Sequence, residues 1–163
     1  MSEMKLPYAL DLSGKVAVVT GAAGVLCSDF SRALAKCGAK VALLDVNDVV
    51  AKKIADEINA DGGEAVAIKA NCLDKASLES AKAIVDEKFG PCDILINGAG
   101  GNNPRATTFD ETFNEATLSD PDKQSFFSIS PDGVRFVFDL NVTAAYYWQA
   151  FNAAKKHIVE QGL

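Results

Sequence analysis

The sequence predicts an α/β protein in which a doubly wound parallel sheet lies between two layers of helices. Short apolar segments alternate strictly with amphipathic ones over residues 15–97, as strands and helices do in consecutive βαβ units. A glycine turn links the first strand to its helix, and a long polar segment interrupts the alternation after residue 100. Because βαβ crossovers are right-handed, this order places helices on both faces of one sheet and predicts three αβα layers.

The first strand is expected at residues 15–20, which are apolar and β-branched without alternation, as in strands buried on both faces. A turn at residues 21–24 follows, and apolar residues then recur at helical spacing until Gly38 ends the first helix. The next three elements are a strand at residues 40–45, a helix at residues 47–60 and a strand at residues 64–70.

The third helix begins after Asp74, which can cap it, and extends to about Phe89. Its inner face is expected to carry Ile84, Val85 and Phe89. A fourth strand follows at residues 93–97. In the strand order 3-2-1-4-5-6 of doubly wound folds, the chain supplies 3-2-1-4 and is expected to stop before a fifth strand.

Residues 101–130 form a long insertion loop, rich in Asn, Thr, Ser, Asp and Pro. A connection of this length is usually functional or mobile. Pro131 is a good first helical residue, and an apolar, aromatic segment follows at residues 134–158, with a break expected near Asn141. We therefore expect one domain, residues 1–163, with one insertion.

Composition excludes several classes of function. The net charge of −6 leaves no broad basic surface for nucleic acid. No apolar run approaches the roughly 20 residues that cross a bilayer. The four cysteines are far apart and there is one histidine, so no metal site is expected. With unpaired cysteines and no signal-peptide pattern, the chain is expected to be cytoplasmic.

Two features point to a nucleotide. A strand that leads through a glycine turn into a helix directs free backbone N–H groups at one point, which suits a phosphate, although a purely structural turn would look the same. Asp45 ends the second strand, where a carboxylate can accept both hydroxyls of an adenosine ribose and repel a 2′-phosphate. This favours NAD over NADP. The alternative is a solvated aspartate that caps the next helix.

These residues resemble the short-chain dehydrogenase/reductase family. Thr20-Gly21 after the first strand, Asp45, and Asn97-Gly98-Ala99-Gly100 after the fourth strand match in order and spacing, the last resembling the family's N-A-G motif. Asn141, in Asp139-Leu-Asn-Val, resembles the helix asparagine of the family's catalytic tetrad. Such a resemblance implies a Rossmann-like fold.

The resemblance extends over residues 15–162, and residues 100–108 with the insertion resemble the D-mannonate oxidoreductase (fructuronate reductase) branch. It implies NAD as the cofactor, a sugar acid as the small-molecule substrate and a homo-oligomer. It also implies a catalytic role for Asn141. The residues implied to bind the cofactor are Thr20, Gly21, Ala23, Gly24, Val25, Leu26, Asp45, Asn71, Cys72, Asn97, Gly98, Ala99 and Gly100.

Some positions depart from the family pattern. Val25 and Cys27 stand where the family turn usually carries glycine, and Asn71 occupies the place of its adenine-binding aspartate. The Asn71 amide oxygen can still accept a hydrogen bond from an adenine amino group, without the charge. Cys27, near a helix N-terminus, would have either a lowered pKa or the role of a small packed apolar residue.

The family's catalytic serine, tyrosine and lysine are absent from these 163 residues. Tyr146 is followed four places later by Ala150, and Tyr147 by Phe151, so neither forms Tyr-x-x-x-Lys. We therefore expect the chain to be the cofactor-binding half of an NAD-dependent oxidoreductase, inactive by itself. The alternative is a non-catalytic nucleotide-binding or interaction module that works as an oligomer.

The sequence allows two interpretations both of the aromatic residues in the last predicted helix and of an arginine in the insertion. Tyr147 and Phe151 lie on one stripe of the last predicted helix, which could pack in the core or against a second subunit. Arg105, in the insertion, could bind the carboxylate of a substrate or be a solvated surface residue.

Overall fold

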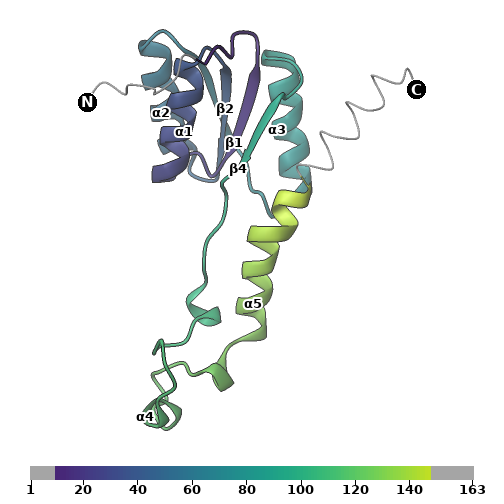
Figure 1. Ribbon diagram of the computed structural model, residues 1–163. Helices are drawn as coiled ribbons and strands as arrows, with labels where there is room; N and C mark the ends of the chain where they lie inside the picture. Colours follow the sequence, from purple (N-terminus) through teal and green to yellow (C-terminus); the bar gives the residue numbers. More distant parts are fainter. Residues whose placement is uncertain (1–9, 148–163) are drawn as a thin grey trace.

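The core of the protein is a four-stranded parallel sheet with the strand order β3-β2-β1-β4, as the computed structural model shows for residues 10–147 (Figure 1). This confirms both the predicted fold class and the predicted strand order. The observed strands lie within one residue of their expected ends: β1 (Val16–Thr20), β2 (Lys40–Asp45), β3 (Glu64–Lys69) and β4 (Ile94–Asn97).

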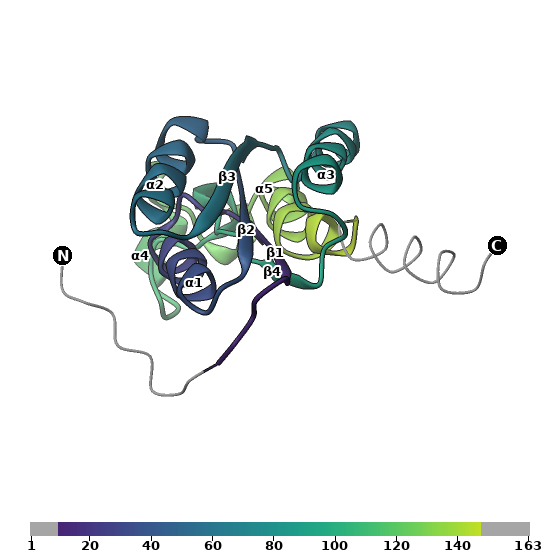
Figure 2. The same cartoon turned by 90° about the horizontal axis from the view of Figure 1, so that it is seen from above.

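Helices cover both faces of the sheet, so the fold has three layers (Figure 2). Helices α1 (Val25–Lys36) and α2 (Asp48–Ala60) pack on one face, and α3 (Lys75–Lys88) packs on the other. Strand β1 divides its side chains between the two cores, with Val18 facing α3 and Val19 facing α1 and α2. The absence of polar alternation in this strand therefore reflects burial on both sides.

The buried face of α3 differs in part from the prediction. Val85 is 1% exposed, and Phe89 is partly buried against the same core, as expected. Ile84 is 38% exposed, so its predicted inward position is wrong. Successive residues of a helix are about 100° apart, and the face that contains Leu78, Ala81 and Val85 turns Ile84 toward solvent.

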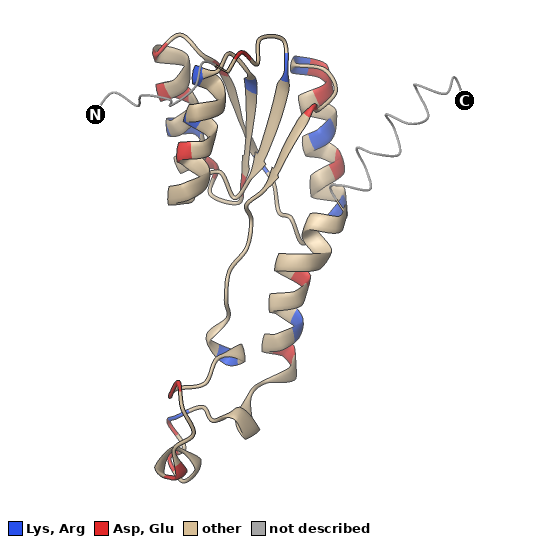
Figure 3. Cartoon of the chain, in the orientation of Figure 1, with Lys and Arg blue, Asp and Glu red and all other residues tan. Residues whose placement is uncertain are grey.

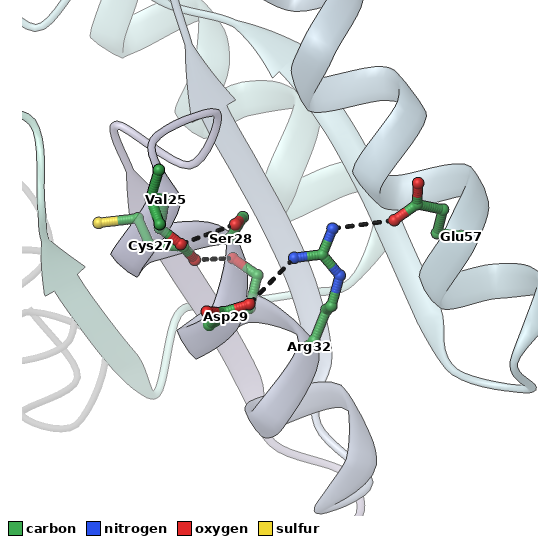
Figure 4. A network of polar contacts seen from close by, with 7 residues as sticks. Val25, Cys27, Ser28, Asp29, Arg32 and Glu57 are labelled. Atoms are coloured by element: carbon green, nitrogen blue, oxygen red, sulfur yellow. Dashed lines mark hydrogen bonds and ion pairs between the residues drawn. The ribbon is translucent and has the colours of Figure 1, made fainter. Parts of the chain in front are cut away.

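The buried residues of helix α1 are all small: Cys27, Ser28, Ser31 and Ala35. Ser28 and Ser31 can be buried because each hydroxyl donates to a carbonyl of its own helix, that of Val25 at 2.8 Å and that of Cys27 at 2.8 Å (Figure 4). Neither hydroxyl therefore requires water. The N-terminal end of α1 lies near the carboxyl end of β1 because only residues 21–24 join the two elements.

An arginine fastens α1 to α2. The guanidinium of Arg32 lies 2.8 Å from the carboxylate of Glu57 on α2 and 3.3 Å from that of Asp29 on its own helix (Figure 4). The hydrogen bond from Arg32 lowers the pKa of the Glu57 carboxyl. The pair therefore links the two helices that cover one face of the sheet.

The insertion is folded, although the sequence predicts a loop without regular structure. Between residues 101 and 130 the chain forms a 3₁₀ turn η1 (Pro104–Ala106), a single helical turn α4 (Glu115–Leu118) and a second 3₁₀ turn η2 (Phe126–Ser128). The Gln124 side chain donates to the carbonyl oxygens of Pro104 and Thr107, at 3.2 and 2.7 Å. Side-chain hydrogen bonds replace an apolar core here, which is why hydrophobic periodicity does not reveal the segment.

Helix α5 (Pro131–Phe138) begins at the predicted proline, and Ser130 caps it by accepting the N–H of Gly133. A π-helical segment, η3 (Asp139–Thr143), continues it around Asn141, where the sequence predicts a break. In Figure 1 the insertion and the start of α5 extend away from the sheet. The predicted helix positions beyond residue 147, Phe151 included, lie outside the described residues.

The surface carries interspersed charges. Figure 3 shows acidic and basic residues mixed over the helices that flank the sheet. Within residues 10–147, no helix is long and apolar enough to span a bilayer. The same residues contain no group of three or more His, Cys, Asp or Glu side chains that could hold a metal ion.

Candidate functional site

The candidate site lies where the four parallel strands end at one edge of the sheet. Thr20, Asp45 and Asn97 are the last residues of β1, β2 and β4. Strand β1 occupies the point where the order of strands reverses, because β2 and β4 lie on its two sides. In open α/β sheets, ligands bind outside the carboxyl ends of the strands at such a point.

Thr20 joins the end of β1 to the loop after β4. Its hydroxyl oxygen accepts the N–H groups of Gly98 and Ala99, both at 3.1 Å, and its O–H donates to the carbonyl of Ile96 at 3.5 Å. The side chain is buried, so these bonds satisfy a hydroxyl that water does not reach. Thr20 thus fixes the glycine loop against the first turn.

The two glycine segments touch backbone to backbone. Gly21 has a positive φ of 65°, and a Cβ there would lie 2.8 Å from the amide nitrogen of Ala99. Glycine is therefore required at this position both by the turn and by the contact. The result is a shallow cradle of main chain between the β1 and β4 loops.

Cys27 occupies space that the cradle would otherwise leave open. Its side chain is 7% exposed, and a Cβ on Gly98 would lie 2.1 Å from its sulfur. Burial, and to a lesser degree the charge of Asp45, raises the pKa of this thiol. Of the two interpretations of Cys27, the structure therefore favours the packed apolar residue.

The N-terminal end of α1 is open to an anion. Gly24 is its N-cap and supplies no side-chain acceptor, and no acidic residue lies in the first turn. The first N–H groups of any α-helix lack an intrahelical acceptor, and here no capping side chain accepts them either. The helix dipole adds partial positive charge at the same place. Val25 and Leu26, both exposed, flank these groups.

Asp45 is tied to the glycine turn as well as to its own strand. Its carboxylate accepts the N–H of Ala23 at 2.9 Å and the N–H of Asn47 at 2.8 Å. Asn47, and not Asp45, caps helix α2, because its side chain accepts the N–H of Val50. The alternative interpretation of Asp45 as a cap is thus wrong.

Asn71 and Cys72 follow β3 at the same edge. The amide oxygen of Asn71 accepts the N–H of Leu73 at 3.0 Å, and its side chain is exposed. Cys72 is buried, and burial raises its pKa. It lines a small hollow at the carboxyl ends of β1 and β4, next to α3 and the helical residues that follow η3, together with Thr20, Leu78, Asn97, Ala99, Ala144 and Ala145.

Asn141 fastens the loop after β4 to the helix beside it. Its amide oxygen accepts the N–H of Gly101 at 3.1 Å, and its amide nitrogen donates to the carbonyls of Gly101 and Val137, each at 2.8 Å. A Cβ on Gly100 would lie 2.6 Å from the Asn141 oxygen. The asparagine therefore positions backbone with its whole amide group.

The model of the short chain dehydrogenase family matches residues 15–157. The chain belongs to this family. An oxidoreductase of Haemophilus influenzae is 46% identical over 131 residues, which are 80% of this chain and 45% of that protein. An oxidoreductase of Bacillus subtilis is 45% identical over 141 residues, covering 86% of this chain and 49% of its own length. The chain spans about half the length of these curated relatives.

Two solved structures extend this likeness to the fold. A protein from Haemophilus influenzae, described as a D-mannonate oxidoreductase and crystallised with NAD, matches with a TM-score of 0.84 at 40% identity, over 90% of this chain and 51% of that one. The 3-ketoacyl-(acyl-carrier-protein) reductase of Brucella melitensis, crystallised with NADH, matches with a TM-score of 0.67 at 27% identity, over 86% of this chain and 49% of its own.

The structure brings most of the predicted residues together, in two contact groups. One joins the first turn, Asp45 and the N-A-G segment, and the other joins Gly100 and Gly101 to Asn141. Asn71 lies two residues beyond the end of β3, and its hydrogen bonds join it to Leu73 and to Ser77 of α3. Sequence reasoning missed the contact between Gly133 and Arg105, for which the only signal is a glycine within the first turn of α5.

Proposed function

We propose that the chain forms the NAD-binding part of a short-chain oxidoreductase that transfers hydride between NAD(H) and a sugar acid. The observation that carries this proposal is the main-chain cradle at the carboxyl edge of the sheet, closed by contacts that exclude side chains at Gly21 and Gly98. The 40% identical relative described as a D-mannonate oxidoreductase with NAD bound supports both the cofactor and the substrate class.

The residues present fit a dinucleotide. The open N–H groups at the start of α1 suit a pyrophosphate, and the glycine segments let backbone come close to it. Asp45 accepts one hydrogen bond from each of two N–H groups, and a carboxylate has about four acceptor sites. It can therefore still accept both hydroxyls of an adenosine ribose. Cys27 fills part of the cradle and would bring the helix less close to the pyrophosphate.

When bound, NADH supplies the hydride that reduces a carbonyl carbon, while a proton goes to the carbonyl oxygen. The family's tyrosine and lysine, which would supply that proton, have no counterpart in Tyr-x-x-x-Lys spacing among these 163 residues. The role we assign to this chain is therefore to hold and orient the cofactor. Asn141 would keep the loop after β4 in place beside it. The non-catalytic module receives no support from the relatives, which are oxidoreductases.

Calorimetric titration with NAD⁺ and NADP⁺ tests the proposal. We expect the chain to bind NAD⁺ at least tenfold more tightly, because the Asp45 carboxylate would face a 2′-phosphate. Asp45→Ala should weaken NAD⁺ binding about tenfold, since hydrogen bonds to a charged group are lost. The control is Asp48→Ala, which removes a carboxylate three residues after Asp45 that is paired with Lys69, and it should change NAD⁺ binding less than twofold. Equal or tighter binding of NADP⁺ would contradict the proposal.

A further inference from the structure

Arg105 stands out among the arginines that the structure describes. Arg32 and Arg135 each lie within hydrogen-bond distance of a carboxylate, 2.8 and 2.7 Å away. The guanidinium of Arg105 is exposed and has no hydrogen-bond or ion-pair partner within residues 10–147. An unpaired surface arginine is ordinary in itself, so the inference depends on how its backbone is held and where it lies.

The backbone of Arg105 is fixed while its side chain is free. Its N–H donates to the side-chain oxygen of Asn103 at 3.0 Å, and its carbonyl accepts the N–H of Ser130 at 3.0 Å. Gly133 lies so close that a Cβ there would be 2.7 Å from the Arg105 carbonyl carbon. The attachment point is therefore fixed, and the guanidinium is free to meet an anion without first breaking an ion pair.

The attachment point lies beside the start of α5, which extends away from the sheet on the side where the strands end (Figure 1). The loop after β4 contacts helix α5 at two places, through Gly101 with Asn141 and through Arg105 with Gly133. Asn141 follows Gly133 by eight residues, which is about 12 Å along a helix. An arginine side chain extended along α5 would cover much of this distance and leave room for a chain of a few carbon atoms above the glycine loop.

Other basic residues near this edge are already paired. Lys69 at the end of β3 lies 3.6 Å from Asp48, and Lys75 at the start of α3 lies 3.5 Å from Glu79. The described lysines without a carboxylate partner within hydrogen-bond distance are Lys36 on α1, Lys53 on α2 and Lys88 on α3. Lys36 and Lys88 lie in the last turns of their helices, at the opposite edge of the sheet. Within residues 10–147, Arg105 is therefore the basic residue without a carboxylate partner on the side of the sheet toward which the strands end.

We propose that Arg105 binds the carboxylate of the substrate and selects sugar acids over neutral polyols. This inference rests on the proposed function and adds the residue that recognises the acid. A guanidinium offers two parallel N–H donors that match a carboxylate, which an ammonium group does not. Arg105 therefore determines substrate specificity, and the cofactor is held by other residues.

Binding to the NAD⁺-loaded chain tests this assignment. D-mannonate and the uncharged D-mannitol are titrated into the wild type, Arg105→Ala, Arg105→Lys and the control Arg135→Ala, and nuclear magnetic resonance follows the arginine Nε signals. We expect mannonate to shift the Arg105 signal, and Arg105→Ala to weaken mannonate binding about tenfold or more. Arg105→Lys should restore only part of this loss. Mannitol binding and Arg135→Ala should show changes of less than twofold.

Several outcomes would overturn the assignment. Mannonate binding that is undetectable, or equal in wild type and Arg105→Ala, contradicts it. So does an equal shift with inorganic phosphate, which would indicate an unselective anion site. A change of oligomeric state in Arg105→Ala without loss of mannonate affinity would assign the arginine to an interface. Because Arg105 lies outside the cradle, NAD⁺ binding should be the same in all variants, and its absence in the wild type would instead overturn the proposed function.

Discussion

At the scale of single residues, the site depends on close contacts that leave no space for a side chain. Gly98 is the clearest case, because an added Cβ would meet the sulfur of Cys27 at 2.1 Å and the carbonyl oxygen of Thr20 at 2.8 Å. The cysteine is a departure from the family pattern, and the neighbouring loop accommodates it with a glycine. Cys27 and Gly98 are therefore expected to depend on each other energetically.

A double-mutant cycle measures this dependence. Gly98→Ala should destabilise the chain by about 1–3 kcal/mol, as overpacking in a well-packed region does. In a Cys27→Ala background the cost should fall, because the sulfur is gone and the Thr20 carbonyl is then the one short contact, the Cβ of residue 27 lying at an ordinary 3.6 Å. Urea unfolding of the four proteins gives the interaction energy. Costs that are equal in both backgrounds would show that the sulfur does not limit the space at Gly98.

The residue scale also shows what the sequence can reveal about the site. Asp45 is identifiable because a carboxylate at the end of a strand has a chemical reason to be there, and it lies beside the glycine turn. The shared contacts of Gly100 and Gly101 with Asn141 cannot be found in this way, because the residues are about forty positions apart and no local pattern links them.

At the scale of elements, buried strands and capped helices were predictable and the insertion was not. Strand β2 has its expected bounds, and Asp74 caps α3, because burial and capping leave local signals. The buried face of α3 was only partly predictable, since Ile84 is as apolar as Val85 and only the position of the sheet decides between them. The turns of the insertion are held by the polar side chains of Asn103, Gln124 and Ser125, which look the same in a loop without structure.

The contact between η1 and α5 leads to a prediction about these two elements. Gly133→Ala would normally favour a helix. Here the added Cβ would lie 2.7 Å from backbone of Arg105, so we expect the insertion to be displaced from α5. Limited trypsin digestion should cleave after Arg105 and Lys123 several times faster than in the wild type.

Gly101→Ala is the matched control, because a Cβ at Gly101 meets nothing within 4 Å. Its digestion rate should equal that of the wild type. If Gly133→Ala is instead digested at the wild-type rate, or more slowly, the insertion is not held by this contact. The backbone of Arg105 would then not be fixed in the way that its proposed role requires.

At the scale of the whole molecule, β4 is one of the two edge strands of the sheet, and it ends at the site. Strand β4 pairs with β1 only, and within residues 10–147 nothing pairs with its other side. Its residues Ile94, Leu95 and Ile96 are apolar, without the charges or proline that usually protect an edge. The relatives are about twice as long as this chain. Within the described residues, this edge is therefore open to pairing with another strand.

We predict that the 163-residue chain self-associates or aggregates. Two surfaces would drive this, the open edge of β4 and the exposed aromatic residues of the insertion, of which Phe126 and Phe127 are 74% and 76% exposed. Light scattering over a concentration series should show a mass that rises with concentration.

The double variant Phe126→Ser, Phe127→Ser separates the two surfaces, because it removes apolar area and leaves β4 unchanged. Supplying the second half of the Haemophilus influenzae relative in trans should reduce scattering if the β4 edge dominates. A monodisperse monomer that unfolds cooperatively would instead show that four strands suffice, and that neither surface needs a cover.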